Sequence, residues 1–131
     1  MFEDHKFGGK PSSSDRIPNP RVTLSNSVEV ENYFTTHDEV VNHVVEELDQ
    51  AKKSIHFLAF SFTHEKIGNA MITAAKEGLD VSGVFETSQA AGQASQYPIL
   101  KVEGLKVYQD GNPRNMHHKC IIIDGAVVIA G

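Results

Sequence analysis

The sequence has no apolar run close to the roughly 18 residues that a membrane-spanning helix needs. Its first ten residues, MFEDHKFGGK, are charged where a signal peptide would be apolar. These two absences predict a soluble chain and leave its compartment open.

Cysteine and excess positive charge are also scarce. The single Cys120 cannot form an internal disulfide, and its isoleucine-rich surroundings favour packing as a small hydrophobe. The formal net charge of −5 gives no general attraction to nucleic acid or anionic lipid, so any phosphate binding must come from a local cluster of donors. Arg114, Lys106 and Lys119 give the C-terminal third a local positive balance, which fits a phosphate-binding mouth or an ordinary surface.

Metal-ligand spacings are missing too. No HxH or HExxH pattern occurs, and neighbouring residues of a strand face apart. A metal site is weighed for a set of residues that includes His117, His118, Asp124, His64 and Glu86. We predict neither a metal nor a cofactor.

The chain length of 131 residues and its 40% hydrophobic content suit one packed domain. Residues 1–23 are rich in glycine, proline and serine and are predicted to be a linker or the tail of a preceding lobe. Residues 24–131 are predicted to form the lobe itself. Because the sequence stops in the apolar strand 126–130, we expect the lobe to be incomplete at its C-terminus and the chain to be part of a longer protein.

The first half of the lobe reads as strand, helix, strand, helix, strand. Thr36 and Glu39 have capping-box spacing and predict a helix to about Lys53, and a Thr63 cap begins a second helix that stops at Gly78. The strands are expected at 28–34, 54–62 and 81–85. The second of these is apolar on both faces, as in a central strand covered by helices on both sides. This order predicts a parallel pair, and the class is α/β with a mixed, mostly parallel sheet flanked by helices.

The second half looks more antiparallel. A small, polar segment at 87–96 is predicted to be a mobile loop. A short helix at 98–103, strands at 105–108, 117–123 and 126–130, and a hairpin turn at Asp124-Gly125 follow.

The strand at 117–123 carries the chemistry. Its period places His117 and Lys119 on one face, about 7 Å apart along the chain, while His118 points away with Cys120. A neutral imidazole beside an ammonium suits phosphoryl transfer, because the imidazole can attack phosphorus while Lys119 neutralises charge on the oxygens. Both residues are thus candidates to bind a substrate phosphate.

Two carboxylates are further candidates. Asp124 lies seven positions after His117, so strand parity turns it to the opposite face, where it suits bonding to turn backbone. Glu86 ends the VSGVFE strand and could approach the site as an orienting carboxylate, or it could be an exposed strand-end residue.

The motif His117-x-Lys119-xxxx-Asp124-xxxxxx-Gly131 resembles the phospholipase D signature, HxK(x)4D(x)6G. The segments SIHFLAFSF, IGNAMITAAKEG, VSGVFE and DGNPRNMHHK stand in the order expected for that superfamily, so the resemblance covers roughly residues 24–131. It implies a phospholipase D/nuclease-like lobe, here the second lobe of a two-motif, bacterial-type protein. It also implies that His117, Lys119 and Asp124 are catalytic.

In that family two such motifs meet, one histidine becomes a phosphohistidine, and no metal is needed. The resemblance therefore implies a phosphodiesterase. Its partner is a second lobe with the HxK(x)4D motif (the HKD motif), which comes from the parent protein or from a homodimer partner. It leaves open a lipid or nucleic-acid substrate, hydrolysis or transfer, and whether His117 is nucleophile or general acid. The alternative is a phosphate-binding or dimerising lobe without turnover.

Overall fold

The computed structural model describes residues 21–34 and 39–131, which fall into two compact units divided between Asn42 and His43. In the first unit, β1 (Arg21–Thr23) pairs antiparallel with β2 (Glu29–Glu31), and an ion pair joins Arg21 to Glu31 across the two strands. β2 lies within the strand expected at 28–34. The domain boundary at residues 23/24 stays a prediction, and Thr36 lies outside the described residues.

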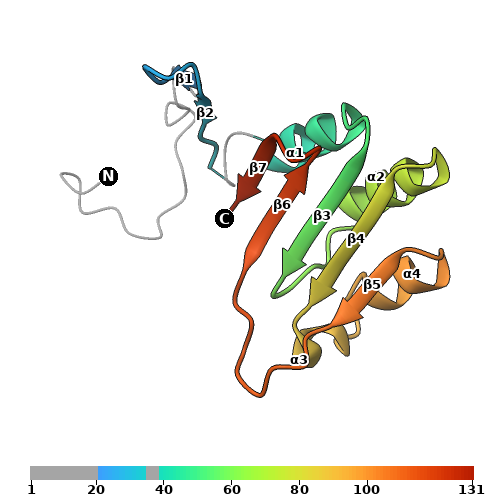
Figure 1. The fold of residues 1–131 in the computed structure, drawn as a ribbon. Coiled ribbons are helices and arrows are strands. Elements are labelled where there is room, and N and C mark those ends of the chain that lie inside the picture. The colour runs from blue at the N-terminus through green and yellow to red at the C-terminus, as the bar shows by residue number, and fades with distance from the viewer. Residues whose placement is uncertain (1–20, 35–38) are drawn as a thin grey trace. The chain divides into compact units, whose positions relative to one another are not determined.

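The second unit is built on a five-stranded sheet of order β5-β4-β3-β6-β7 (Figure 1). Its strands are β3 (Ser54–Ala59), β4 (Asp80–Phe85), β5 (Lys106–Gln109), β6 (Lys119–Ile123) and β7 (Val127–Ala130). β3, β4 and β5 run parallel, whereas β6 and β7 are antiparallel to their neighbours. The predicted α/β class with a mixed sheet flanked by helices is confirmed: β3, β4, β5 and β7 run in one direction, and β6 between β3 and β7 runs in the other.

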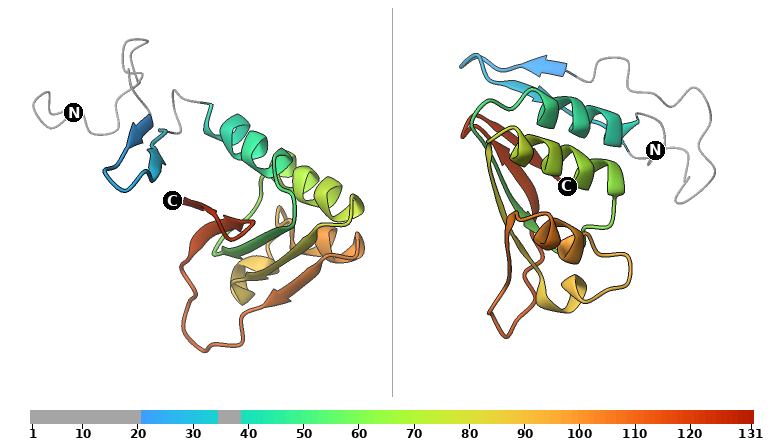
Figure 2. Two further views of the ribbon diagram at one scale, coloured as in Figure 1. Left: turned by 45° about the horizontal axis from the view of Figure 1, so that its top comes forward. Right: turned by 90° about the vertical axis from the view of Figure 1, so that its right-hand side faces the viewer.

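Four helices accompany the sheet: α1 (Val40–Asp49), α2 (Glu65–Lys76), α3 (Thr87–Ala90) and α4 (Tyr97–Val102). α1, α2 and α4 lie along one face of the sheet (Figure 2). Alternate residues of the strands are buried beneath them, among them Ile55 and Phe57 of β3 and Phe85 of β4. The fully buried side chains Leu48 and Met71 come from α1 and α2, so the core lies between this face and the helices.

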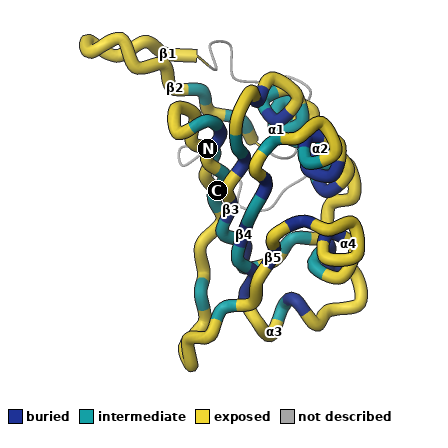
Figure 3. Tube along the Cα trace, turned by 45° about the vertical axis from the view of Figure 1, so that its right-hand side comes forward, coloured by how far each residue is buried: buried dark blue, intermediate teal, exposed yellow. Residues whose placement is uncertain are grey.

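The opposite face of the sheet is open within the described residues. His56, Tyr108 and Ile122 are exposed there, and Leu58 and Val84 are only half-buried. Along β3 and β4, buried positions alternate with half-buried or exposed ones (Figure 3). The expectation that helices cover β3 on both sides is therefore not met in this part of the chain. The apolar character of the strand signals burial or half-burial, and it does not identify what covers the second face.

The helix ends differ slightly from those expected. α1 ends at Asp49, four residues before the expected Lys53, and the N-cap of α2 is His64, whose side chain makes no cap hydrogen bond, in place of Thr63. Gly78 ends α2 as predicted, because its φ of +95° is a conformation that residues with a side chain rarely adopt.

The segment predicted as a mobile loop is more ordered than its composition indicates. α3 occupies Thr87–Ala90, and the side chains of Ser95 and Gln96 are buried. The N–H of Gln96 donates to the carbonyl of Phe62 at 2.9 Å, which anchors the segment to the residues that follow β3. The loop prediction was therefore wrong for 87–90, which form α3, whereas 91–96 contain no helix or strand, as expected of a loop.

Across the described ranges 21–34 and 39–131, every helix is too short or too polar to cross a membrane.

Candidate active site

The candidate site lies at the edge of the sheet where β3 and β4 end and β6 begins. Ala59, the last residue of β3, pairs with Lys119, the first residue of β6, and an extended loop from Asp110 to His118 leads into that strand (Figure 1). The N–H of Asp110 donates to the carbonyl of Phe85 at 2.8 Å, so the loop starts from the end of β4. Carboxyl ends of parallel strands are a common place for a functional site in α/β folds.

His117 and Lys119 are in contact at this edge. The Lys119 ammonium lies 3.1 Å from Nδ1 and 3.2 Å from Nε2 of the His117 imidazole, and it donates to the His117 carbonyl at 3.3 Å. Both residues are exposed. The two side chains that the sequence singled out therefore lie together, where an anion can reach both of them, although β6 begins at Lys119 and His117 lies in the loop before it, not in a strand that starts at 117 as expected.

The intervening residue is held by its backbone. The carbonyl of His118 accepts the N–H of Phe60 at 2.8 Å, which continues the pairing of β3 with β6 beyond Ala59. Cys120, two positions further along, lies opposite Leu58 and lines the open face of the sheet.

Sequence reasoning missed Phe60, which belongs to the site. Its ring centroid lies 4.5 Å from that of His117, and the Lys119 ammonium lies 5.4 Å from the centre of the same ring. An aromatic residue at the end of an apolar strand gives no sequence signal for this arrangement, because strand parity predicts its side and not its neighbours.

Glu86 lies next to the site and is only 6% exposed. Its carboxylate accepts the backbone N–H of Met116 at 2.7 Å, and it accepts both the N–H and the hydroxyl of Ser88 at the start of α3. The Met116 N–H, followed by the donors of Ser88, lowers the pKa of the Glu86 carboxyl against the opposing effect of burial. Glu86 thus holds the backbone of the loop beside His117, and it also holds the start of α3.

Asp124 lies at the other end of β6 from His117. Its carboxylate accepts the backbone N–H groups of Lys52, Lys53 and Ser54 at 2.8, 2.8 and 2.9 Å. These hydrogen bonds, that of Ser54 first, lower the pKa of the Asp124 carboxyl. The sequence predicted that Asp124 bonds the backbone of its own turn, whereas the N–H groups that it binds belong to the end of the loop between α1 and β3 and to Ser54, the first residue of β3.

The hairpin that carries Asp124 has the expected turn. Asp124 and Gly125 have φ values of +54° and +67°, the positive pair of a type I′ turn, and the N–H of Ala126 donates to the carbonyl of Ile123 at 2.9 Å.

The other two basic residues that the sequence singled out, Lys106 and Arg114, lie in different parts of the structure. Lys106 pairs with Asp80 at 2.7 Å, at the end of the sheet opposite His117. Lys106 therefore does not contribute to a phosphate-binding mouth, whereas Arg114 lies exposed on the loop that leads to the site. In the described part of the chain, no three His, Cys, Asp or Glu residues are grouped closely enough to hold a metal ion.

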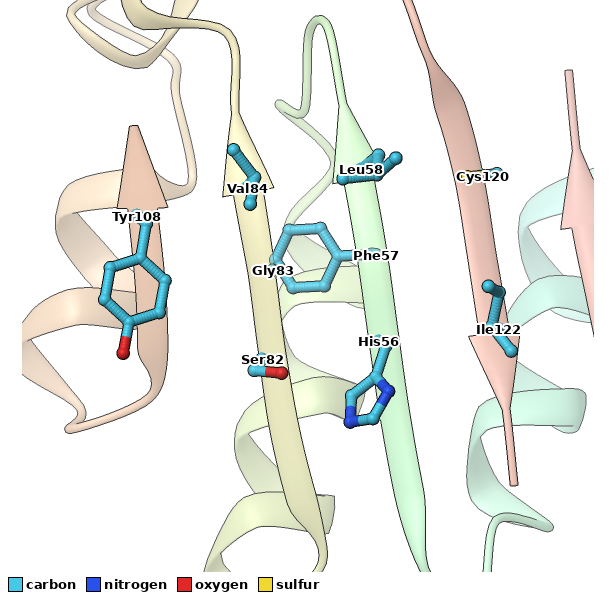
Figure 4. A pocket seen from close by; sticks show the side chains of 9 residues that line it. All are labelled: His56, Phe57, Leu58, Ser82, Gly83, Val84, Tyr108, Cys120 and Ile122. Carbon is cyan, nitrogen blue, oxygen red and sulfur yellow. The ribbon is translucent and has the colours of Figure 1, made fainter. Parts of the chain in front are cut away.

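A hollow of about 380 Å³ lies elsewhere, on the open face of the sheet (Figure 4). Its walls are mainly apolar and come from the middle of β3, β4, β5 and β6. It is lined by His56, Phe57, Leu58, Ser82, Gly83, Val84, Tyr108, Cys120 and Ile122. His117 and Lys119 do not line it, so the hollow and the candidate site are separate features.

Comparison with known proteins identifies a family to which this chain is similar. Residues 44–131 match the family described as "Cardiolipin synthase, PLD-like domain". Among curated proteins, human mitochondrial cardiolipin hydrolase is 29% identical over 94 residues, covering 72% of this chain and 37% of that protein. A phospholipase D of Rickettsia bellii is 26% identical over 116 residues, covering 88% of this chain and 58% of that protein.

Solved structures agree. Nuc of Salmonella typhimurium, a phospholipase D family member, has a TM-score of 0.64 at 33% identity and covers 72% of this chain and 62% of that one. NucT of Helicobacter pylori has a TM-score of 0.63 at 22% identity, covers 71% of this chain and 65% of that one, and so supports the fold. The chain spans roughly two fifths of the length of the cardiolipin hydrolases it matches.

Proposed function

Because the chain belongs to the phospholipase D-like domain family, we propose that it supplies one half of the active site of a metal-independent phosphodiesterase. His117 and Lys119 form this half-site. A second His-x-Lys motif comes from another lobe of a longer protein or from a second copy of the chain. The observation that carries the proposal is the contact of 3.1 Å between the Lys119 ammonium and the His117 imidazole at the exposed edge of the sheet.

The proposed reaction has two steps. A neutral imidazole of one motif attacks phosphorus, the bond from phosphorus to the leaving oxygen breaks, and the imidazolium of the other motif protonates that oxygen and becomes a neutral imidazole. Water then attacks the phosphohistidine and gives its proton to the second imidazole, which frees the first histidine. Lys119 neutralises charge on the non-bridging oxygens in both steps. His117 can serve as nucleophile or as acid.

Glu86 and Asp124 act indirectly in this proposal. Glu86 orients the backbone that carries His117 through the N–H of Met116. Asp124 holds the loop before β3 against the far end of β6, and so supports the strand pair on which the site is built. In this proposal Asp124 therefore acts by positioning, without contact to the substrate, and not as the catalytic residue that the resemblance implies.

The substrate class is proposed only as a phosphodiester. The names of the matched cardiolipin hydrolases and of the Rickettsia phospholipase D favour a phospholipid, but this chain covers only part of each protein. A nucleic acid contains the same reacting bond and remains the other candidate.

The second candidate function is phosphate binding or dimerisation without turnover. It is favoured by the presence of a single HxK(x)4D motif in the sequence, at His117, Lys119 and Asp124, since the other His-x-Lys tripeptide, at His64 and Lys66, lacks the aspartate. The two candidates differ in one respect: the enzyme needs a second motif at the same phosphate, whereas a binding lobe does not.

The experiment that tests the proposal measures hydrolysis of bis-p-nitrophenyl phosphate in EDTA. The proteins compared are the chain over a range of concentrations and the chain joined to a second motif-bearing lobe. We expect turnover in the joined protein, its loss in His117→Ala, and its retention in His118→Ala, the adjacent histidine that serves as the matched control. Turnover per chain that rises with concentration would identify a second copy as the partner. Absence of turnover in the joined protein would favour the binding lobe.

A further inference from the structure

Phe60 follows β3 directly and is fixed there by its backbone. Its N–H donates to the carbonyl of His118 at 2.8 Å, so its position is tied to the residue between His117 and Lys119. The backbone of Phe60 is therefore placed by the same strand pairing that places the site.

The ring of Phe60 contacts both functional side chains. Its centroid lies 4.5 Å from the His117 ring centroid with an angle of 51° between the planes, which is within the range of favourable aromatic pairs. The Lys119 ammonium lies 5.4 Å from the same centroid, within the distance of a cation–π contact. One side chain thus restricts where the imidazole and the ammonium can lie.

The ring of Phe60 is not part of the core. The core aromatics of this region pack on one another, with Phe57 edge-on to Phe62 and to Phe85 at centroid distances of 5.8 and 5.4 Å. Phe60 is half-buried, and it belongs neither to the buried core nor to the hydrophobic residues packed against that core. Its ring contacts His117 and Lys119 instead.

This arrangement matters because His117 and Lys119 are both exposed and their long or rotatable side chains would otherwise sample several rotamers. A nucleophile or acid is effective only when it is held close to its reacting geometry, and a misplacement of 1 Å can cost about a hundredfold in rate. A ring that packs on the imidazole reduces this freedom without using either of its nitrogens.

We propose that Phe60 is a positioning residue of the half-site, whose ring holds the His117 imidazole and the Lys119 ammonium in their mutual arrangement. This inference rests on the proposed function. Its physical content, the packing of Phe60 on His117, can also be tested without turnover.

The first test is spectroscopic and uses the whole 131-residue chain. A ring packed on the imidazole shifts the His117 ring C–H proton resonances upfield, so we expect Phe60→Leu to move them downfield and Phe60→Tyr to leave them close to their original positions. Tyr108→Leu removes an exposed aromatic ring elsewhere on the sheet and should not move them. Unchanged His117 resonances in Phe60→Leu would overturn the inference.

The second test is kinetic and uses the joined protein of the hydrolysis assay. We expect Phe60→Leu to lower kcat about tenfold, a fraction of the loss that a 1 Å misplacement can cause, and Phe60→Tyr to restore it to within about twofold. A kcat for Phe60→Leu equal to that of the parent protein would overturn the inference while leaving His117-dependent turnover intact. If the parent shows no His117-dependent turnover, the proposed function fails, and the resonance test still decides whether Phe60 packs on His117.

Discussion

The backbone N–H of Met116 donates a hydrogen bond of 2.7 Å to the carboxylate of Glu86, 30 positions earlier in the chain. The same carboxylate accepts the N–H and the hydroxyl of Ser88, so it joins the end of β4, the start of α3 and the residue that precedes His117. Because Glu86 is only 6% exposed, water cannot readily replace these bonds. The loop into the candidate site is thus anchored at Met116, the residue before His117.

The anchoring by Glu86 predicts that Glu86→Gln loosens this loop. An amide has one acceptor oxygen in place of two, so either Met116 or Ser88 loses its partner. We expect the Met116 amide hydrogen to exchange with solvent faster in the variant, as measured by NMR. Glu103→Gln changes a surface carboxylate paired with Lys76 and serves as the control. Equal exchange at Met116 in Glu86→Gln and in the parent protein would contradict the anchoring role.

Asp124 predicts a dependence of stability on pH. Three backbone N–H groups hold the pKa of its carboxyl below the usual range, so the unfolded chain takes up a proton more readily than the folded one. The resulting stabilisation is fully present above the ordinary aspartate pKa of about 3.9 and is lost as the pH falls through the lower pKa of the folded state.

The measurement is the thermal unfolding midpoint of the parent and of Asp124→Asn as a function of pH. We expect the parent to be the more stable protein near neutral pH and the difference to shrink below about pH 4. Asp49→Asn alters an exposed carboxylate at the end of α1 and is the matched control. A difference between the parent and Asp124→Asn that stays constant from pH 7 to pH 3 would show that charge on Asp124 does not contribute.

Gly83 lies at a position in the sheet where there is no room for a side chain. A Cβ atom added there would lie 2.4 Å from the Phe57 ring, which cannot move away freely because Phe62 and Phe85 pack against it. We expect Gly83→Ala to lower the free energy of unfolding by about 1–3 kcal/mol, the usual cost of overpacking a core. Urea denaturation measures this. Gly111→Ala, in a position with open space, should cost far less, and an equal effect of the two substitutions would refute the packing explanation.

Much of this architecture could be predicted from the sequence because it depends on local patterns. Short apolar segments predict the strands, Gly78 marks the end of a helix, and Asp124-Gly125 predicts the hairpin turn; the structure confirms them, although β3 and β6 are shorter than expected. The proximity of His117 and Lys119 is also local, since it follows from their two-residue spacing, with His117 just before β6. Recognition of the phospholipase D signature relied on these same residues, and the family match bears it out.

The features that could not be predicted depend on tertiary contacts. Phe60 resembles any core phenylalanine in the sequence, and only the pairing of β3 with β6 places its ring on His117. The burial of Glu86 is set by the return of the loop near Met116, which no local pattern encodes. The open face of the sheet is a third case, because an apolar strand indicates that a face can be covered and not that it is covered.

The position of Lys119 predicts that its charge contributes to anion binding at the proposed half-site. Its ammonium is exposed and lies within 3.2 Å of both imidazole nitrogens, so a phosphate that binds there draws on a charge already placed beside His117. We expect Lys119→Met, which keeps side-chain length and removes the charge, to weaken binding of dimethyl phosphate about tenfold at low salt, since hydrogen bonds to charged groups are the stronger class.

The binding is measured by NMR titration of the 131-residue chain, and the effect should diminish at high salt because exposed charges are screened. Lys106→Met is the matched control, since it removes the same charge at the opposite end of the sheet, where Lys106 pairs with Asp80. An equal loss of affinity in the two variants would mean that only the net charge of the chain attracts the anion. A loss confined to Lys119→Met would place the anion at the half-site, because the two substitutions change the net charge identically and differ only in position.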